Sequence, residues 1–527
     1  MLTPPAFRSL DTLLAGCVLT LALHGCAATL RPAGPGPAEG EPAPVPLPAS
    51  MVPRAGAPFV LARATAIVTA PDPSTRGVAE ALGRLLRPAT GLALPIVTDR
   101  SPLPGDISLR LDSANASLGD EGYALEVDTS GVRIGAHRAA GLFHGIQTLR
   151  QLLPARIESD IHRADSGWIV APVIIRDAPR FAWRGAMLDV ARHFFTVREV
   201  EQYIDILAMY KLNVLHLHLA DDQGWRIEIR SRPPLTAVGA ATQVGARDGG
   251  FYTQDDFARL VRYAADRFVT IVPEIDMPGH SNAALSAYPG LSCGKRPPGL
   301  YSGIDVGWST LCVEREETYA LVEDVVRELA AISPGPYIHI GGDEVESLTP
   351  AQYARFVERV QDIVARHGKR MAGWEEIAHA RLAPGTMVQQ WHTDSVVKAL
   401  AMGASIVLSP ASHTYLDMQY EPSTALGLHW AGYVNLRTAY LWDPATLIPG
   451  VTEANVLGVE APLWSETVRN ITAAEYLAMP RLPAIAEVGW TPQASRQWDD
   501  FARRLAPHAI RWQLLGINFH PSSEIAW

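Results

Sequence analysis

The fold is decided by the stretch Tyr337-Ile338-His339-Ile340-Gly341-Gly342-Asp343-Glu344-Val345, in which an apolar run leads through a glycine pair into two adjacent acids. The apolar run predicts a strand, because β-branched and aromatic residues favour the pleated surface. Neighbours in a regular strand point to opposite faces, so Asp343 and Glu344 can share one site only if the glycines turn the chain out of the strand. Two carboxylates held together can divide their roles, one protonated and one charged. The alternative interpretation is a strand followed by an acidic helix N-terminus, which suits the helix dipole.

The composition is that of a globular protein without a nucleic-acid partner. At 527 residues the chain is too long for one ordinary domain, so two or three are expected. Hydrophobic residues make up 48% and charged residues 19%, which is typical of globular chains. The net charge is −10 and no basic run occurs, which disfavours nucleic acid. The 13 tryptophans suit sugar rings, although Trp more often fills cores.

Residues 1–26 are predicted to be an export signal. Arg8 precedes an apolar run over 13–23, which is too short to span a bilayer. The run ends at Leu23-His24-Gly25-Cys26, which resembles the lipobox of bacterial lipoproteins and makes Cys26 the predicted lipidation site. The protein is therefore expected in the periplasm or at the outer membrane of a bacterium, with a lipid anchor to the membrane.

Two alternatives remain at the signal. Leu14-Ala15-Gly16-Cys17 matches the lipobox more closely but leaves almost no apolar run before it, and ordinary cleavage near Ala27 or Ala28 would leave no lipid. Each alternative still predicts export. Residues 27–57, rich in Pro, Gly and Ala, are predicted to be a disordered tether, because they cannot bury a core.

Cys293 and Cys312 are the only cysteines outside the signal region. In an oxidising compartment a pair with no other partner is most simply a disulfide. A metal site or a thiol nucleophile is the alternative, but the local sequence offers no partner residues for either. The sequence therefore predicts a loop closed by a disulfide.

Residues 58–177 are predicted to form a small α+β domain. The expected strands lie at 66–68, 107–111, 123–127 and 132–135, and the expected helices at 75–86 and 139–153. His144 in the second helix is expected to be structural. No catalytic constellation is evident in this domain.

Residues 178–527 alternate between strands and helices. The expected strands are 186–190, 214–219, 269–274, 337–341, 370–374, 387–391, 405–409 and 456–460. The expected helices include 197–210, 254–267, 315–331 and 351–367, the second with Thr253 as N-cap. Eight strands with intervening helices predict a (β/α)₈ TIM barrel, an α/β fold, preceded by the α+β domain. A doubly wound sheet is the alternative, but no Gly-rich phosphate loop follows the first strand.

The barrel places its chemistry at the C-terminal ends of the strands. Polar and aromatic residues follow nearly every expected strand, namely Asp189, Arg192, Asp221, Asp222, Glu274, Asp276, His280, Asp343, Glu344, Trp374, Trp391, Tyr415, Asp417, Trp464 and Glu466. This density indicates an active site, although each tryptophan alone could fill the core.

The chain resembles the family 20 glycoside hydrolases, the β-N-acetylhexosaminidases. The matching stretches are Trp183 to Phe195, His216 to Asp222, Pro273 to His280, His339 to Glu344, and Tyr415 to Asp417. The resemblance covers Phe181 to the C-terminus and extends more weakly to the preceding α+β domain. It implies an exo-acting enzyme that removes terminal non-reducing β-linked GlcNAc or GalNAc from an oligosaccharide or glycoconjugate, such as chitin fragments or host glycans.

The resemblance also implies a role for each matching residue. Glu344 is implied to be the general acid and later the general base, Asp343 to orient and polarise the 2-acetamido group, and Tyr415 to donate a hydrogen bond to its carbonyl. The other implied residues are Arg192, Asp417 and Glu466 at the sugar hydroxyls, Trp374, Trp391 and Trp464 as walls, and Asp221, His280 and Asp276 as residues that support the acid.

The implied mechanism is substrate-assisted retention, in which the acetamido oxygen attacks and an oxazolinium forms. No metal or other cofactor is expected: the acids could suggest Mg²⁺ or Ca²⁺, but Arg192 and the tryptophans favour a sugar. A two-carboxylate retaining glycosidase is disfavoured because no separate nucleophile motif stands out. An inactive glycan-binding barrel would keep the tryptophans without needing Glu344. The sequence does not choose between GlcNAc and GalNAc or set the oligomeric state.

Overall fold

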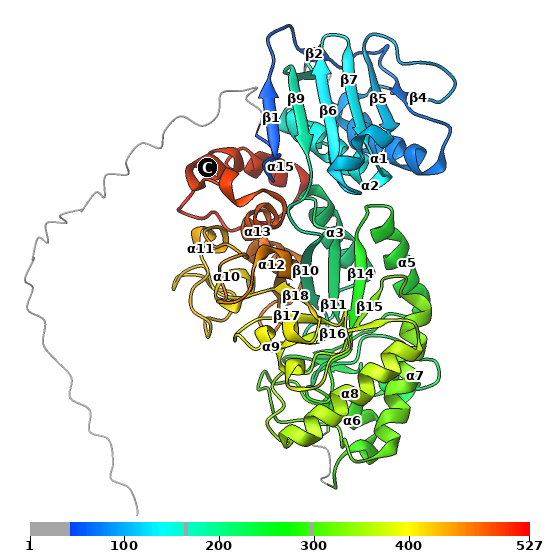
Figure 1. Cartoon of the computed structure of the whole chain (residues 1–527), viewed down its shortest axis with the longest axis vertical. Coiled ribbons are helices and arrows are strands. Elements are labelled where there is room, and N and C mark those ends of the chain that lie inside the picture. The colour runs from blue at the N-terminus through cyan, green and yellow to red at the C-terminus, as the bar shows by residue number, and fades with distance from the viewer. Residues whose placement is uncertain (1–42, 163–166, 295–298) are drawn as a thin grey trace, which may run out of the picture. The chain divides into compact units, whose positions relative to one another are not determined.

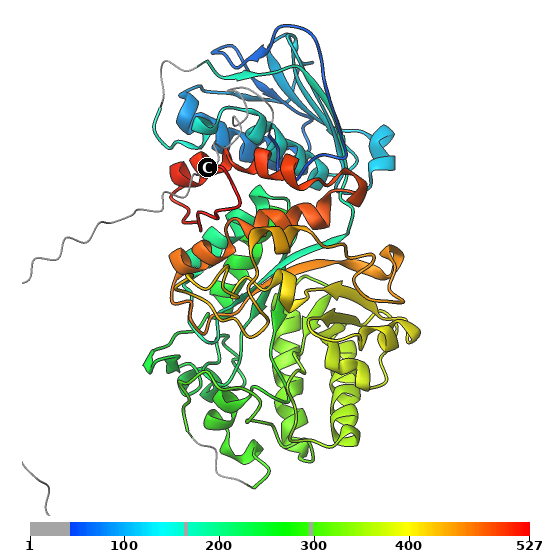
Figure 2. The ribbon, with the colours of Figure 1, turned by 90° about the vertical axis from the view of Figure 1, so that its left-hand side faces the viewer.

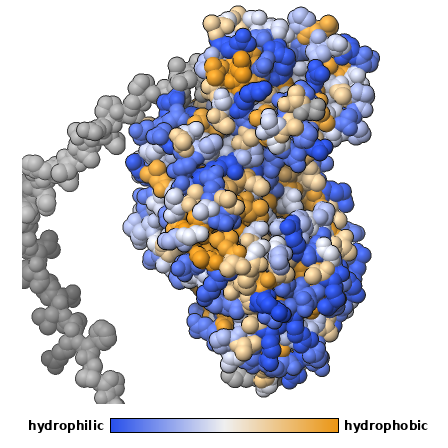
Figure 3. Space-filling model, viewed as in Figure 1, coloured by the Kyte–Doolittle hydropathy of each residue, from blue (hydrophilic) through white to orange (hydrophobic). Residues whose placement is uncertain are grey.

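The computed structural model describes residues 43–162, 167–294 and 299–527 (Figure 1). The predicted export signal, Cys26 and residues 27–42 of the predicted tether lie outside these residues. Within them, no helix combines the length and the apolar character needed to cross a bilayer. Hydrophilic residues cover most of the face shown in Figure 3, with apolar residues in patches between them.

Residues 43–57 are folded, which corrects the predicted tether at its C-terminal end. Val45 is fully buried and exchanges two hydrogen bonds with the Gln151 side chain, of 2.7 and 2.9 Å. Strand β1 (Ser50–Pro53) pairs antiparallel with β9 (Val173–Asp177). Pro-rich composition could not reveal this, because an edge strand tolerates proline and its order comes from distant partners.

The N-terminal α+β domain is a seven-stranded sheet with two helices against it, α1 (Pro73–Thr90) and α2 (Ala139–Leu152) (Figures 1 and 2). The sheet order is β1-β9-β6-β7-β5-β3-β4, with β3 (Ile67–Val68), β4 (Ile96–Val97), β5 (Asp106–Leu111), β6 (Tyr123–Asp128) and β7 (Gly131–Ala136). A separate pair joins β2 (Phe59–Val60) to β8 (Ile169–Val170). His144 of α2 is buried and its Nε2 lies 3.0 Å from Glu121, which fits a structural role.

The remainder forms a closed barrel of eight parallel strands, which confirms the predicted fold class. The strands are β10 (Trp183–Asp189), β11 (Val214–His218), β14 (Thr270–Glu274), β15 (Tyr337–His339), β16 (Arg370–Trp374), β17 (Met387–Gln390), β18 (Ser405–Leu408) and β19 (Val456–Leu463). β15 ends before the predicted Gly341, whereas β19 continues beyond the predicted Glu460. The strands match the predicted positions because buried parallel strands are continuous apolar runs.

Three of the four long helices between the strands begin at capping boxes. α3 (Val197–Met209), α5 (Gln254–Ala265) and α8 (Pro350–Arg366) each start with a capping box, at Thr196, Thr253 and Thr349. The predicted N-cap at Thr253 is therefore confirmed. The fourth long helix, α7 (Glu316–Ile332), precedes β15.

Shorter elements fill the connections between strands or follow the last strand, β19. They are α4 (Pro234–Ala237), β12 (Thr242–Gln243), β13 (Arg247–Asp248), α6 (Asn282–Ala287), α9 (Val396–Ala401), α10 (Ala411–Thr414), α11 (Leu436–Tyr440), α12 (Ile471–Ala478), α13 (Arg481–Trp490), α14 (Trp498–Leu505) and α15 (His508–Leu515). The connection after β18 is long and holds only short helices, so side chains on it can reach the barrel end.

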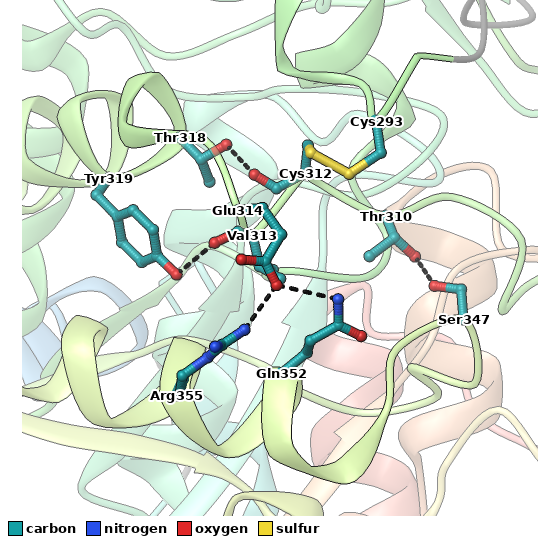
Figure 4. Close-up of a disulfide and its surroundings, with 10 residues drawn as sticks. All are labelled: Cys293, Thr310, Cys312, Val313, Glu314, Thr318, Tyr319, Ser347, Gln352 and Arg355. Atoms are coloured by element: carbon teal, nitrogen blue, oxygen red, sulfur yellow. Dashed lines mark hydrogen bonds and ion pairs between the residues drawn. A yellow bond between two sulfur atoms is a disulfide. The ribbon is translucent and has the colours of Figure 1, made fainter.

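The predicted pair Cys293 and Cys312 forms a disulfide ahead of α7 (Figure 4). The Cys312 carbonyl accepts a hydrogen bond of 2.7 Å from the Thr318 hydroxyl of α7. The hydroxyl groups of Thr310 and Ser347 lie 2.6 Å apart. The segment around Cys312 is therefore held at three points. The disulfide links it to Cys293, and hydrogen bonds link it to α7 and to the connection after β15.

Candidate active site

The glycine pair after β15 turns the chain so that both acids leave the strand. Gly341 and Gly342 have φ of +64° and +98°, in the region that favours glycine. A Cβ at Gly341 would also clash with the carboxylate of Asp276. Glu344 itself has φ of +51°, a strained value that concentrates at functional sites. Helix α8 begins only at Pro350, so the interpretation as an acidic helix N-terminus is wrong.

His280 lies between the two acids. Its Nε2 is 3.2 Å from Glu344 Oε2 and 3.7 Å from Asp343 Oδ2, and its Nδ1 is 3.3 Å from Asp221 Oδ2. Burial lowers the pKa of His280, but the charge of Asp221 outweighs burial and holds that pKa well above its ordinary value. The imidazolium is therefore the positive centre around which the carboxylates gather.

Asp276 and Asp343 are buried side by side. Burial and the charge of Asp343 raise the pKa of Asp276 well above its ordinary value, so Asp276 holds a proton. Burial also raises the pKa of Asp343, while His280 and the hydrogen bond from Asp276 oppose that rise. Among the described residues, Asp276 Oδ2 and Asp343 Oδ1 have no other hydrogen-bond partner. One proton shared between the two groups lets Asp343 carry the negative charge.

Arg192 follows β10 and links the acids to the aromatic residues. Its Nη2 lies 2.8 Å from Asp221 Oδ2, and its Nη1 lies 3.5 Å from Asp189 Oδ2. The guanidinium carbon is 4.8 Å from the ring centre of Trp464, a cation–π contact. Its Nε has no partner among the described residues, so Arg192 keeps a buried donor for a ligand oxygen.

Asp417 and Glu466 add two carboxyl groups that interact with each other, and the charge of Glu466 also acts on Arg192. Asp417 Oδ1 accepts a hydrogen bond of 3.4 Å from the backbone N–H of Trp464. Burial and the charge of Glu466 raise the pKa of Asp417 well above its ordinary value, and burial raises that of Glu466 against the opposing charge of Arg192. Carboxyl groups beside a guanidinium can exchange several hydrogen bonds with neighbouring hydroxyl groups.

Five aromatic side chains form a continuous series of contacts, which we call the aromatic wall. Ring centres lie 5.7 Å apart for Trp374–Trp464, 6.3 Å for Tyr415–Trp464, 5.9 Å for Tyr415–Trp430 and 6.0 Å for Trp391–Trp430. Burial and the charge of Asp417 raise the pKa of Tyr415 well above its ordinary value, so its hydroxyl remains a donor. The wall is deeply buried at Trp374 and open at Trp430, which is 54% exposed.

Two carboxyl groups hold the indoles of the wall in place. Glu274 Oε1 accepts a hydrogen bond of 2.9 Å from Trp374 Nε1. Both carboxyl oxygens of Glu376 lie 3.3 Å from Trp391 Nε1. Burial and the charge of Asp343 raise the pKa of Glu376 to about 8. Glu376 is therefore a neutral partner of Trp391 in the pH range in which most carboxyl groups are charged.

The predicted catalytic and substrate residues come together at the C-terminal ends of the barrel strands. The contacts above join Arg192, Asp221, Asp276, His280, Asp343, Glu344, Trp374, Trp391, Tyr415, Asp417, Trp464 and Glu466. Several His and Asp groups here lie close enough to share an ion, but Arg192 and the charged His280 already occupy their carboxylates.

Sequence reasoning missed Trp430 and Glu376. Glu376 could have been found, since it follows Trp374 by two residues at a strand end. Trp430 lies in the long connection after β18, far from any strand end, and nothing in its local sequence marks it.

Comparisons with known proteins agree with this geometry. The family model of the glycosyl hydrolase family 20 catalytic domain matches residues 181–493, and that of domain 2 of the family matches 41–178. A β-N-acetylhexosaminidase from Cellulomonas fimi is 44% identical over 481 residues, which are 90% of this chain and 94% of that protein. A β-hexosaminidase from Porphyromonas gingivalis is 38% identical over 84% of this chain and 60% of that protein.

Solved structures of hexosaminidases also resemble this chain. An N-acetyl-β-hexosaminidase from Streptomyces plicatus, in complex with Thio-NAglucal, is 49% identical with a TM-score of 0.89, over 92% of this chain and 98% of that chain. A mutant of the S. plicatus enzyme in complex with its product GlcNAc has the same TM-score, at 48% identity and the same coverage.

Proposed function

The chain belongs to glycosyl hydrolase family 20 and is a β-N-acetylhexosaminidase of that family, and from this premise we propose that it removes terminal non-reducing GlcNAc or GalNAc by substrate-assisted, retaining hydrolysis. The observation that carries the proposal is the difference in burial between two adjacent acids, Asp343 and Glu344. Asp343 is buried against Asp276, whereas the Glu344 side chain is 35% exposed. One acid is therefore placed to hold a charge inside the site and the other to exchange protons at its edge.

In the first step the substrate supplies its own nucleophile. The acetamido carbonyl oxygen attacks C1, the bond from C1 to the glycosidic oxygen breaks, and Glu344 gives its proton to that oxygen. Positive charge develops on the acetamido group, and the negative Asp343 stabilises this charge in a site from which the aromatic wall excludes water. Tyr415 donates a hydrogen bond to the acetamido oxygen and fixes its direction of attack.

In the second step Glu344, now a carboxylate, takes a proton from water. The water attacks C1 of the oxazolinium, the bond from C1 to the acetamido oxygen breaks, and the acetamido group is restored. Because C1 is attacked twice from opposite sides, its configuration is retained. His280 lies 3.2 Å from Glu344 and steadies the carboxylate between the two steps.

We also propose that the enzyme acts from the chain end. Arg192, Asp417 and Glu466 would bind the 3-, 4- and 6-hydroxyl groups of the sugar, which leaves no position for a further sugar on that side. Digestion of a β-1,4-linked GlcNAc tetrasaccharide should then release single GlcNAc units and shorten the chain by one unit at a time. Early release of disaccharide would contradict exo-action.

The function is tested with two aryl glycosides that share one leaving group. A 4-nitrophenyl 2-acetamido-β-glucoside should be hydrolysed, while the 2-hydroxyl analogue should be almost inert, because it lacks the nucleophile. Comparable hydrolysis of both would favour a protein carboxylate as nucleophile. Binding of the sugar without hydrolysis of either would favour the inactive glycan-binding alternative.

A further inference from the structure

Residues 299–311, which we call the stapled loop, present apolar side chains to solvent close to the disulfide. Leu300, Ile304, Val306 and Trp308 are all exposed, Trp308 at 37%. Exposed apolar side chains that gather in one patch are a feature of binding surfaces. The aromatic wall does not include this segment, so its apolar side chains are not explained by the site described above.

Buried polar groups fix the position of the stapled loop. Asp222 is buried after β11, and its Oδ1 accepts hydrogen bonds from the Ser309 hydroxyl and from the Asn282 backbone N–H at 2.9 Å. The Gln223 amide donates a hydrogen bond of 3.0 Å to the Gly303 carbonyl. Together with the disulfide, these contacts hold the loop in one conformation before any ligand arrives.

Tyr301 and Trp308 form an aromatic pair on this loop. Their ring centres are 4.9 Å apart with planes at 67°. The Asp305 backbone pairs with one polar atom of each residue, since its N–H donates to the Tyr301 hydroxyl at 2.8 Å and its carbonyl accepts from Trp308 Nε1 at 3.1 Å. The indole N–H of Trp308 is therefore already paired within the loop, and the rings can meet an apolar face.

The loop packs against the backbone that carries Glu344. A Cβ at Gly307 would lie 3.6 Å from the Glu344 carbonyl oxygen, and the Thr310 and Ser347 hydroxyls lie 2.6 Å apart (Figure 4). The oxygen that Glu344 protonates belongs to the leaving group. The group attached to that oxygen therefore leaves the site past Glu344, where the stapled loop stands.

We propose that Tyr301 and Trp308 form a platform for the sugar unit on the leaving-group side of the scissile bond, an inference that rests on the proposed function. The C–H face of a β-linked pyranose is flat and apolar, and it packs well on aromatic rings. The substrate class is then a β-linked oligosaccharide, with a sugar on each side of the bond, rather than a hexosamine linked to a small group.

The test compares two substrates in the full-length Trp308→Ala variant. On the β-1,4-linked GlcNAc disaccharide, kcat/KM should fall at least about tenfold, which corresponds to about 1.4 kcal/mol of transition-state binding, with KM rising. On GlcNAc β-fluoride, whose leaving atom is too small to reach the platform, the loss should stay below about twofold. Trp308→Phe should keep most of the disaccharide activity, since it retains a flat apolar ring.

The controls distinguish a loss of disaccharide binding from a general defect in the folded protein. Leu441→Ala removes another exposed apolar side chain and should leave both substrates unaffected. The inhibition constant of a GlcNAc-derived thiazoline, which occupies only the site of the terminal sugar, should be unchanged in Trp308→Ala. Equal losses on both substrates, or no loss on the disaccharide, would overturn the platform and leave the proposed function standing. A wild type that hydrolyses neither substrate would overturn the proposed function, and the platform with it.

Discussion

At the scale of single residues, the site depends on giving similar groups different surroundings. Asp343 and Glu344 are neighbours in the chain, yet one is buried against a protonated Asp276 and the other reaches solvent. The motif alone could identify both acids, because glycine before paired carboxylates predicts a turn into a site. It could not predict the protonated partner, since Asp276 comes from the end of another strand and its pKa depends on burial.

Replacement of Glu344 by Gln tests the proton relay. Glu344→Gln keeps the shape of the side chain but can neither donate nor take the proton, so turnover of an oligosaccharide should fall by at least about 10²-fold. Aryl glycosides with an activated leaving group should lose less in the first step, because that oxygen needs little protonation. An equal loss on both kinds of substrate, measured by single-turnover kinetics, would place the acid elsewhere.

Glu376 predicts a pH dependence of stability. Its pKa is about 8 in the folded protein against an ordinary value of 4.5, so the folded state holds a proton that the unfolded state releases within this window. The free energy of unfolding should therefore fall as the pH rises from about 4.5 to 8. Glu376→Gln cannot ionise and should lose less stability across the window. Melting curves of the two proteins at pH 5 and pH 8.5 decide this, and a parallel decline in both would refute the assignment.

At the scale of elements, the barrel strands were predictable and their exact ends were not. The apolar runs marked all eight strands, but β15 stops at His339 because Gly341 has a positive φ, and β19 runs on to Leu463 because β10 continues to pair with it. Of the residues in the aromatic wall, the sequence predicted all except Trp430. Trp430 comes from an irregular connection, whose course is set by packing with Trp391 and Tyr415 rather than by local sequence.

The disulfide should stabilise the molecule by restricting its unfolded chain. Cys293 and Cys312 are separated by 19 positions, and closing a loop of this size contributes about 3 kcal/mol in the chain-entropy model. The double variant Cys293→Ser with Cys312→Ser should therefore unfold at lower urea concentration. The unfolded mature wild type should show neither thiol free. Two titratable thiols, or an unchanged urea midpoint, would contradict this contribution.

At the scale of the whole molecule, the α+β fold and the barrel were predictable, but the folded state of residues 43–57 was not. The Pro-rich composition of residues 27–57 predicted a tether throughout, whereas Val45 and strand β1 are part of the folded unit. Their order comes from Gln151 and β9, more than a hundred residues away in the chain, and no local pattern shows such partners.

Anchoring through Cys26 remains a proposal that rests on the lipobox-like sequence. Cys26→Ser should move the protein from the membrane fraction into the soluble exported fraction, because it removes the lipidated side chain. Fractionation of the producing bacterium, with mass spectrometry of the mature N-terminus, measures this. A wild type that is already soluble and begins after a non-lipidated cleavage site would refute the anchor.

The central claim is that the substrate's acetamido oxygen, and no side chain, attacks C1. The most direct measurement is kcat/KM for aryl N-acyl-β-glucosaminides whose acetyl methyl group carries none, one, two or three fluorine atoms. Fluorine withdraws electrons from the carbonyl oxygen and weakens it as a nucleophile, while the leaving group stays the same. Attack by the acetamido oxygen predicts a stepwise fall in kcat/KM with each fluorine, by orders of magnitude over the series. A rate that is nearly independent of fluorination would contradict the account and assign the attack to a carboxylate of the protein.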